Sequence, residues 1–332
     1  MTVGALGVAL LAAVAGAVAL GGRSKGRAHH APRPVHRAVA RAAPARSPSG
    51  LLLGKPHFAL AGIAAPRPDP VQIPFHRPPR AGLLFDLSNG RVLWQRDASR
   101  RLPIASLTKM MTALLTVKSA PSGAPVLVTR EAVGADGSKV GVLPVRRHVR
   151  LESLLYGLML PSGNDAAVAL AQHIAGSVPR FVRRMNVEAA RLGMGCTHFT
   201  SPHGYYDQGN FSCAADLAVL AHYDLAQTRI ARVTDTYHAV LPFPIKGGKL
   251  YLANNNPMLI YGYPGTTGLK TGYTVASGRC LVATAERHGV RLGVVLLHSA
   301  DPATQARKLL DRAFDRVYHQ RSVPEPPMPP TA

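Results

Sequence analysis

The spacing of apolar and polar residues changes along the chain and predicts distinct elements. Two short apolar runs, 83–87 and 91–95, are joined through Ser88-Asn89-Gly90. Asn-Gly between two such runs is typical of a β-hairpin. Two later runs rich in valine and leucine, 278–285 and 291–297, are joined by a short polar segment and predict a second hairpin.

Between these hairpins, apolar residues recur at the three- and four-residue spacing of helices. The predicted helices cover residues 106–117, 151–160, 165–174, 179–192, 216–225 and, after the second hairpin, 301–318. The last helix opens with Asp301-Pro302, an N-cap followed by proline at the first helical position. Hairpins at both ends with helices between them predict an α/β (α+β) domain, in which an antiparallel sheet packs against a helical block.

The composition divides the chain into four parts. Residues 1–21 contain an uncharged apolar run and predict a signal peptide or an N-terminal membrane anchor. Residues 22–80 are basic and rich in proline, alanine and arginine, which predicts a disordered linker. Residues 81–322 are predicted to form one folded domain, followed by a disordered proline-rich tail over 323–332.

The charge of the chain first suggests an anionic partner. The sequence has 39 Lys and Arg against 17 Asp and Glu, a formal net charge of +22. Residues 1–80 hold eleven of these cations and one acid, while aromatic residues make up only 6% of the chain. A nucleic-acid surface needs cations interleaved with stacking aromatics, so we expect no nucleic-acid partner. The cell envelope, as membrane or wall polymer, is the expected anionic neighbour of the N-terminal part.

The first motif with chemical meaning is Ser106-Leu107-Thr108-Lys109 at the start of a predicted helix. A three-residue step places Ser106 and Lys109 on one helix face. A serine hydroxyl becomes a nucleophile when a base removes its proton, and a lysine amine with a depressed pKa is such a base. On its own this motif is common.

Two further motifs each have an ordinary structural explanation as well. Ser162-Gly163-Asn164 lies between two predicted helices, where the hydroxyl could relay a proton and the carboxamide could bind an amide; Asn164 could equally be a helix N-cap. Lys270-Thr271-Gly272, followed by Tyr273, fits a strand whose Lys and Thr bind a carboxylate and whose glycine permits close approach of the substrate backbone. The same residues also fit an ordinary edge strand.

The three motifs in this order are the signature of penicillin-recognising acyl-serine enzymes. Longer stretches resemble the D-alanyl-D-alanine carboxypeptidases, the low-molecular-mass penicillin-binding proteins. The stretches that carry this resemblance are 81–86, 89–93, 103–112, 160–167, 192–194, 199–204 and 268–274.

The resemblance implies a β-lactamase/transpeptidase-like domain with its site between sheet and helices. It implies Ser106 as the acylated nucleophile, Lys109 as its base, and Ser162 with Asn164 as the second wall of the site. Lys270 and Thr271 would hold the terminal carboxylate of a D-Ala-D-Ala stem peptide. The backbone N–H groups of Ser106 and Tyr273 would form the oxyanion hole.

The resemblance also implies a role in peptidoglycan biosynthesis and cell shape outside the cytoplasm. The terminal D-alanine of a stem pentapeptide would be released, β-lactams would be covalent inhibitors, and neither a metal nor a cofactor is expected. Many relatives carry a second β domain and a C-terminal anchor, so attachment of this chain is expected at its N-terminus.

Two alternatives share the scaffold. A serine β-lactamase of class A would place a glutamate after the S-x-N motif to activate water, but residues 197–210 contain none. A D,D-endopeptidase or transpeptidase stays open, because the motifs do not choose between water and an amine as acceptor.

The three cysteines are too few for a disulfide-built scaffold. Cys196 and Cys213 flank the loop containing Pro202-His203-Gly204, and the sequence leaves open whether they pair. Cys280 is expected to be a buried thiol in a strand.

Overall fold

The computed structural model describes residues 58–63, 68–205 and 208–320. The predicted leader, 1–21, and the predicted tail, 323–332, lie outside these residues, as does most of the predicted linker. Within the described residues, no helix is both long enough and apolar enough to span a membrane.

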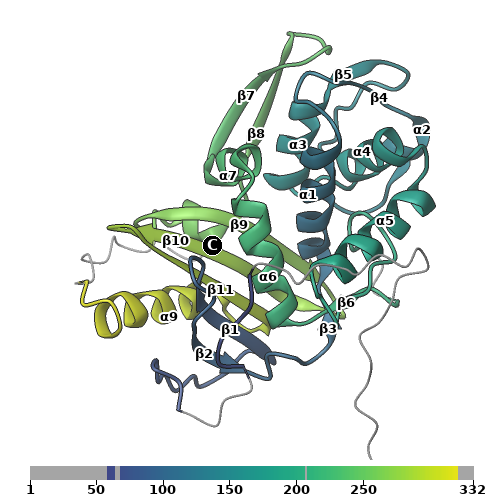
Figure 1. The fold of residues 1–332 in the computed structure, drawn as a ribbon. Coiled ribbons are helices and arrows are strands. Elements are labelled where there is room, and N and C mark those ends of the chain that lie inside the picture. Colours follow the sequence, from purple (N-terminus) through teal and green to yellow (C-terminus); the bar gives the residue numbers. More distant parts are fainter. Residues whose placement is uncertain (1–57, 64–67, 206–207, 321–332) are drawn as a thin grey trace, which may run out of the picture. The chain divides into compact units, whose positions relative to one another are not determined.

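A five-stranded antiparallel sheet contains both predicted hairpins (Figure 1). The first consists of β1 (Ala81–Asp86) and β2 (Val92–Arg96), and the second of β10 (Gly278–Arg287) and β11 (Val290–Ser299). With β9 (Thr266–Thr274) the strand order is β2-β1-β11-β10-β9. Pairing of β1 with β11 joins the two ends of the domain, and β9 is left at one edge of the sheet.

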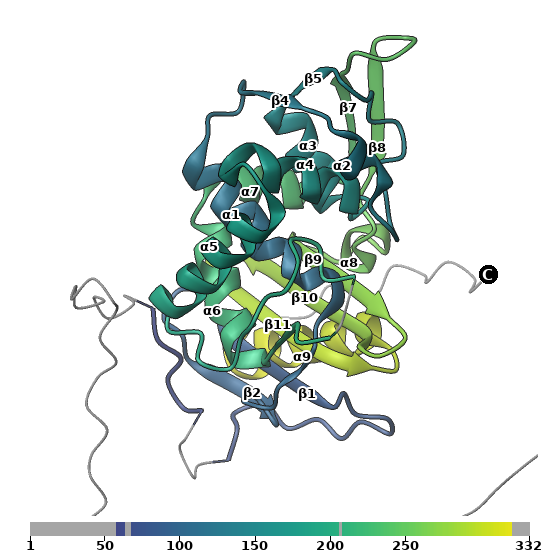
Figure 2. The same cartoon turned by 90° about the vertical axis from the view of Figure 1, so that its right-hand side faces the viewer.

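The sheet is covered on both faces, and alternate residues of its strands serve the two faces. Leu281 packs in a cluster with Leu309 and Phe314 of α9 (Pro302–Arg316), whereas Val282 packs in the cluster of the helical block. Figure 2 shows α9 and the helical block on opposite sides of the sheet. The predicted cap of α9 is confirmed, because the Asp301 side chain accepts a hydrogen bond from the N–H of Thr304.

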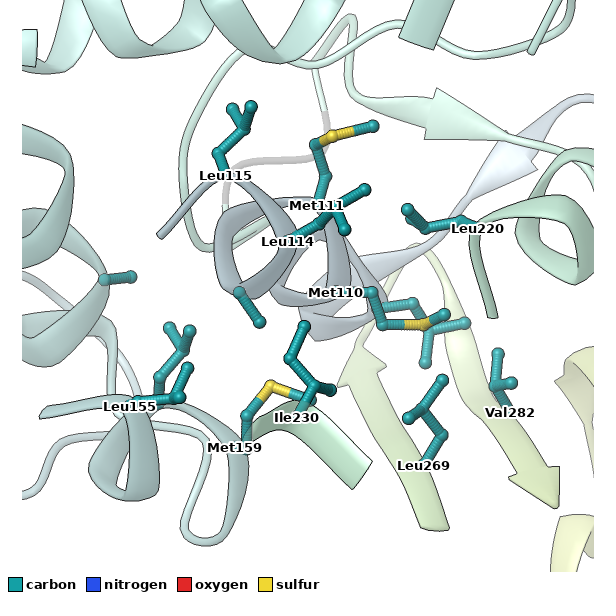
Figure 3. Packing of buried hydrophobic residues seen from close by; sticks show 14 of the residues in the cluster. Met110, Met111, Leu114, Leu115, Leu155, Met159, Leu220, Ile230, Leu269 and Val282 are labelled. Atoms are coloured by element: carbon teal, nitrogen blue, oxygen red, sulfur yellow. The ribbon is translucent and has the colours of Figure 1, made fainter. Parts of the chain in front are cut away.

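The helical block surrounds α1 (Lys109–Ser119). Every residue of α1 from Lys109 to Thr116 is buried, which is the pattern of a helix packed on all sides. Figure 3 shows Met110 and Leu114 of α1 among side chains from neighbouring helices and strands. The other helices are η1 (Ala105–Thr108), α2 (Arg130–Gly134), α3 (Leu151–Met159), α4 (Asn164–Ala175), α5 (Val178–Arg191), α6 (Ala214–Leu225), α7 (Thr228–Asp235) and α8 (Pro257–Ile260).

Several short elements were not expected from the sequence pattern. The hairpin of β7 (His238–Pro242) and β8 (Lys249–Ala253) projects beside the helical block (Figure 1). Two further pairs are β3 (Leu102–Pro103) with β6 (Phe211–Ser212), and β4 (Pro125–Leu127) with β5 (His148–Arg150). The strands of two or three residues are too short for a periodic pattern to become visible.

The described part of the predicted linker, residues 58–63 and 68–80, packs against the folded domain. Phe58 is buried and stacks on His222 with ring centroids 3.9 Å apart. Val71 is also buried, and its N–H donates to the carbonyl of Leu93 in β2. Because β2 is the other edge of the sheet, this extended chain covers an edge that would otherwise expose unpaired backbone groups.

One buried acid in α6 predicts a pH-dependent stability. Asp224 is fully buried, and among the described residues its carboxylate oxygens have no hydrogen-bond partner. Burial raises the pKa of Asp224 well above its usual value. The native state therefore holds this proton more tightly than the unfolded state, and stability falls as pH rises above the unfolded pKa of about 4.

We expect Asp224→Asn to raise the free energy of unfolding at pH 8 by about 1–3 kcal/mol, with a smaller gain at pH 4. Urea unfolding at both pH values measures this, with the partly exposed Asp315→Asn as control. An equal gain at both pH values would show that ionisation of Asp224 is not the cause.

Candidate active site

Ser106 lies in η1, immediately before α1. The preceding Ala105 has φ +47°, a left-handed conformation that costs energy for a residue with a Cβ. The sharp entry into the helix leaves Ser106 partly exposed while Lys109 is fully buried. The Nζ of Lys109 donates to Ser106 Oγ over 2.8 Å, so the structure brings these side chains together as their spacing predicts.

The environment of Lys109 favours a neutral amine. Its Nζ also donates to the backbone carbonyl of His203 at 3.0 Å, and among the described residues it forms no ion pair. Burial lowers the pKa of Lys109 well below its usual value, and the nearby charge of Lys270 lowers it further, while Asp165 acts in the opposite direction. A neutral amine at this distance can accept the proton of Ser106.

The S-x-N motif forms the turn between α3 and α4. Ser162 has φ +66°, and its Oγ is buried without a hydrogen-bond partner among the described residues. Asn164 is not the N-cap that the sequence also allowed, because Gly163 holds that position and Asn164 begins the helix. The amide nitrogen of the Asn164 side chain donates to the carbonyl of Asp136, and its Oδ1 has no partner among the described residues.

The Asp165 side chain fixes the S-x-N turn to the segment that precedes α3. Its two carboxylate oxygens accept hydrogen bonds from the N–H groups of Val140 and Gly141, at 2.9 and 3.0 Å. The N–H of Asn164 donates to the carbonyl of Ser138 at 2.6 Å. The segment before α3 is thereby fixed against α4, and Ser138 faces the same groove as Ser106.

The K-T-G motif lies on edge strand β9, against η1. Lys270 is buried, and burial lowers its pKa to about 7. Its Nζ donates to the carbonyl of Thr271, whose hydroxyl donates to Asn255 Oδ1 at 2.8 Å. At Gly272 a Cβ would lie only 3.2 Å from the backbone nitrogen of Ser106, so the absence of a side chain allows the strand to approach the serine.

A groove of about 620 Å³ joins these parts, a size that suits a peptide-sized ligand. Its lining includes Ser106, Ser138, Ser162, Asn255, Thr271, Gly272, Tyr273 and Arg279. Lys109 and Lys270 are buried, and Tyr273 is mostly exposed.

Several lining residues and one backbone group were not expected from the sequence. Ser138, Asn255 and Arg279 belong to no motif, although the run Asn254-Asn255-Asn256-Pro257 is a recognisable turn signal. No sequence motif identifies the carbonyl of His203 as a partner of Lys109. Every residue has a backbone carbonyl, and only the fold places this one next to Nζ.

The cysteine pairing that the sequence left open is present. Cys196 and Cys213 form a disulfide with Cα atoms 5.9 Å apart, and Cys280 is a buried thiol. Asp216 lies beside the disulfide, within 4.8 Å between potential ligand atoms. Because the two sulfurs are bonded to each other, this trio does not offer thiolate ligands to a metal.

A serine hydrogen-bonded to a buried lysine, with an S-x-N turn and a K-T-G strand beside one groove, is the arrangement that characterises penicillin-recognising acyl-serine enzymes. The sequence profile of the D-alanyl-D-alanine carboxypeptidases, peptidase family S11, matches residues 76–301, and the chain belongs to this family.

Named relatives agree with this assignment. The chain is 34% identical over 245 residues to D-alanyl-D-alanine carboxypeptidase DacF of Bacillus subtilis, covering 71% of this chain and 62% of the relative. It is 35% identical over 223 residues to DacB2 of Mycobacterium tuberculosis, covering 67% and 75%. The chain thus spans under two thirds of the length of the Bacillus relative.

Solved structures share the fold. A D-alanyl-D-alanine carboxypeptidase from Mycobacterium tuberculosis superposes with a TM-score of 0.69 at 31% identity, covering 77% of this chain and 97% of that one. A Streptomyces DD-transpeptidase superposes with a TM-score of 0.68 at 30% identity, covering 74% and 99%. The predicted β-lactamase/transpeptidase-like fold is confirmed.

The buried amine predicts the outcome of replacing Lys109 by a permanent cation. Lys109→Arg keeps a long side chain next to Ser106 but replaces the neutral amine with a guanidinium that stays protonated and cannot act as a base. We expect acylation by a fluorescent penicillin to slow by about 10²–10⁴-fold. Lys118→Arg, the same change in the exposed last turn of α1, is the control. Acylation of Lys109→Arg at the rate of the control would exclude Lys109 as the base.

Proposed function

We propose that the protein is a serine-type D-Ala-D-Ala carboxypeptidase that removes the terminal D-alanine from peptidoglycan stem pentapeptides through an acyl-enzyme on Ser106. The observation that carries this proposal is the 2.8 Å contact between Ser106 Oγ and the buried Lys109 amine. The family to which the chain belongs, and the activity by which its relatives are named, supply the substrate class.

Acylation begins when Ser106 Oγ attacks the carbonyl carbon between the last two D-alanines while Lys109 takes the hydroxyl proton. The backbone N–H groups of Ser106 and Tyr273 stabilise the oxyanion, in keeping with the close approach of β9 to η1 at Gly272. The Ser162 hydroxyl relays a proton to the leaving amine. Its lack of another partner among the described residues supports this role.

The terminal carboxylate of the substrate binds at Lys270 and Thr271. With a pKa of about 7, Lys270 is partly neutral at physiological pH in the free enzyme. An arriving carboxylate favours the charged ammonium form, so substrate binding and protonation of Lys270 reinforce each other. Asn164 Oδ1 is available to accept an N–H of the substrate peptide.

Water then resolves the acyl-enzyme and releases the shortened peptide. The absence of glutamate from residues 197–210 speaks against the deacylation device of a class A β-lactamase. We therefore expect penicillin to form a long-lived acyl-enzyme. A transpeptidase or endopeptidase activity is the second candidate, favoured by the similarity to a Streptomyces DD-transpeptidase.

The same proposal places the enzyme outside the cytoplasm, where stem peptides are exposed. The uncharged run near the N-terminus would serve as signal peptide or membrane anchor, and the basic residues after it would contact anionic polymers or lipids of the envelope. Deleting residues 22–57 should reduce binding of the protein to envelope fragments at low salt. Unchanged binding would show that this segment is only a spacer.

The proposed reaction predicts two activities that depend on one hydroxyl. Wild-type protein should be labelled by a fluorescent penicillin and should release one D-alanine per stem pentapeptide, whereas Ser106→Ala should do neither. Ser119→Ala, the same change at the exposed end of α1, should retain both.

Other outcomes would point elsewhere. An unlabelled wild type, or equal labelling of Ser106→Ala, would exclude the mechanism. Fast turnover of penicillin would favour a β-lactamase, and cross-linked peptide products would favour the transpeptidase.

A further inference from the structure

A loop closed by the disulfide holds the first turns of α1. This Cys196–Cys213 loop, described over residues 196–205 and 208–213, contacts three buried residues of η1 and α1. The Thr112 hydroxyl donates to the carbonyl of Pro202 at 2.6 Å, and Lys109 Nζ donates to the carbonyl of His203 at 3.0 Å. In addition, Thr108 Oγ1 accepts a hydrogen bond from the Asn210 side chain at 3.0 Å.

The loop approaches η1 closely at one glycine. Gly204 has φ +74°, and a Cβ there would lie 2.0 Å from the carbonyl oxygen of Ala105 and 2.4 Å from Thr108 Oγ1. Its N–H donates to Ser201 Oγ at 2.9 Å, which fixes the turn. The position of the His203 carbonyl, which accepts the hydrogen bond from Lys109, is therefore fixed by a tightly packed turn.

The ends of the loop are fixed at the start of α6. The disulfide joins Cys196 to the fully buried Cys213, the residue before α6. Asp216 of α6 accepts hydrogen bonds from the N–H of Cys196 and the hydroxyl of Thr197, at 2.9 and 2.6 Å. A covalent closure and a carboxylate clamp thus restrain the segment that reaches Lys109.

We propose that the disulfide-closed Cys196–Cys213 loop is a positioning element for Lys109, which holds the amine against Ser106 and keeps water away from it. The inference rests on the proposed acylation of Ser106. The loop supplies the His203 carbonyl that orients Nζ, and the residues on either side of it contact α1 and η1: Pro202 at Thr112, and Gly204 at Ala105. Thr112 and Asn210 act through Lys109 and are positioning residues.

The proposal predicts how the reaction depends on pH. Among the described residues, the charged and titratable groups facing Lys109 are Lys270 from β9, Asp165 from α4 and His203 from the loop itself, beside Ser106. Opening the disulfide alters none of these groups chemically and changes only the restraint on the loop that carries His203. If the loop loosens, water reaches Nζ, the pKa of Lys109 rises towards its usual value, and less neutral base is present at pH 7.

The test compares the pH profile of acylation by a fluorescent penicillin in wild type and in a Cys196→Ser/Cys213→Ser variant. We expect the rising limb of the variant to move to higher pH. A limb that moves by about one pH unit makes the rate at pH 7 about tenfold slower. Treating wild type with a dithiol, which is oxidised to its own disulfide as the protein disulfide is reduced, should reproduce the change. The variant should not respond, although it retains Cys280.

A second variant tests the same contact without removing the disulfide, so a folding defect caused by loss of the disulfide cannot confuse the result. Thr112→Val removes the hydroxyl that binds Pro202 but preserves the shape of the side chain. It should move the profile in the same direction. Thr116→Val is the matched control, because within the described part of the chain that buried hydroxyl bonds only to the carbonyl of Thr112, in α1 itself.

The outcomes separate the two proposals. Folded variants that acylate with the wild-type pH profile would overturn the positioning role of the loop while leaving the proposed function intact. A lower rate at every pH, with the profile otherwise unmoved, would also overturn it. A wild type that is not labelled at all would instead contradict the proposed function.

Discussion

The burial of the Lys109 ammonium group is the constraint on which the site depends. Taking a cation out of water without a carboxylate partner strongly favours its neutral form, and a second buried lysine nearby adds to that preference. The same burial that destabilises the charged lysine makes it a base for Ser106. Burying Lys109 thus lowers the stability of the folded protein and at the same time makes the lysine reactive as a base, a combination that is common at active sites.

The rest of the fold keeps this arrangement in place. Helix α1 is enclosed by apolar side chains, so the residues of its first turn cannot turn towards solvent (Figure 3). Strand β9 approaches from one side through Gly272, α4 supplies the clamped wall around Asn164, and the Cys196–Cys213 loop closes the remaining side. These elements come from different parts of the chain. They surround Lys109 but leave Ser106 partly exposed in the groove.

The sequence predicted the parts of the structure that have strong local signals. Both hairpins carry alternating or continuous apolar runs with a clear turn, and the long helices carry their spacing and, for α9, an Asp-Pro start. The three motifs lie beside one groove because β9, α3 and α4 all pack against η1 and α1. Family resemblance, rather than periodicity, supplied their roles.

What the sequence did not predict depends on tertiary contacts. The proline-rich chain before residue 80 lies along β2 through backbone hydrogen bonds that leave no periodic pattern. The contact of Lys109 with the carbonyl of His203 involves a backbone atom, and Asn255 and Arg279 join the groove only through folding. The N-cap interpretation of Asn164 was wrong because Gly163, whose backbone is extended, takes that position and has no side chain to cap the helix.

The most direct test of this account is the titration of Lys109 itself. In protein labelled with ¹³C-lysine, the Cε shift of each lysine reports its protonation, and the signal lost in Lys109→Arg identifies Lys109. The account predicts a titration midpoint well below the usual 10.5, so that a neutral amine is present near neutral pH. A midpoint near 10.5 in the folded enzyme would contradict it, because Lys109 would then be a cation that cannot take the proton of Ser106.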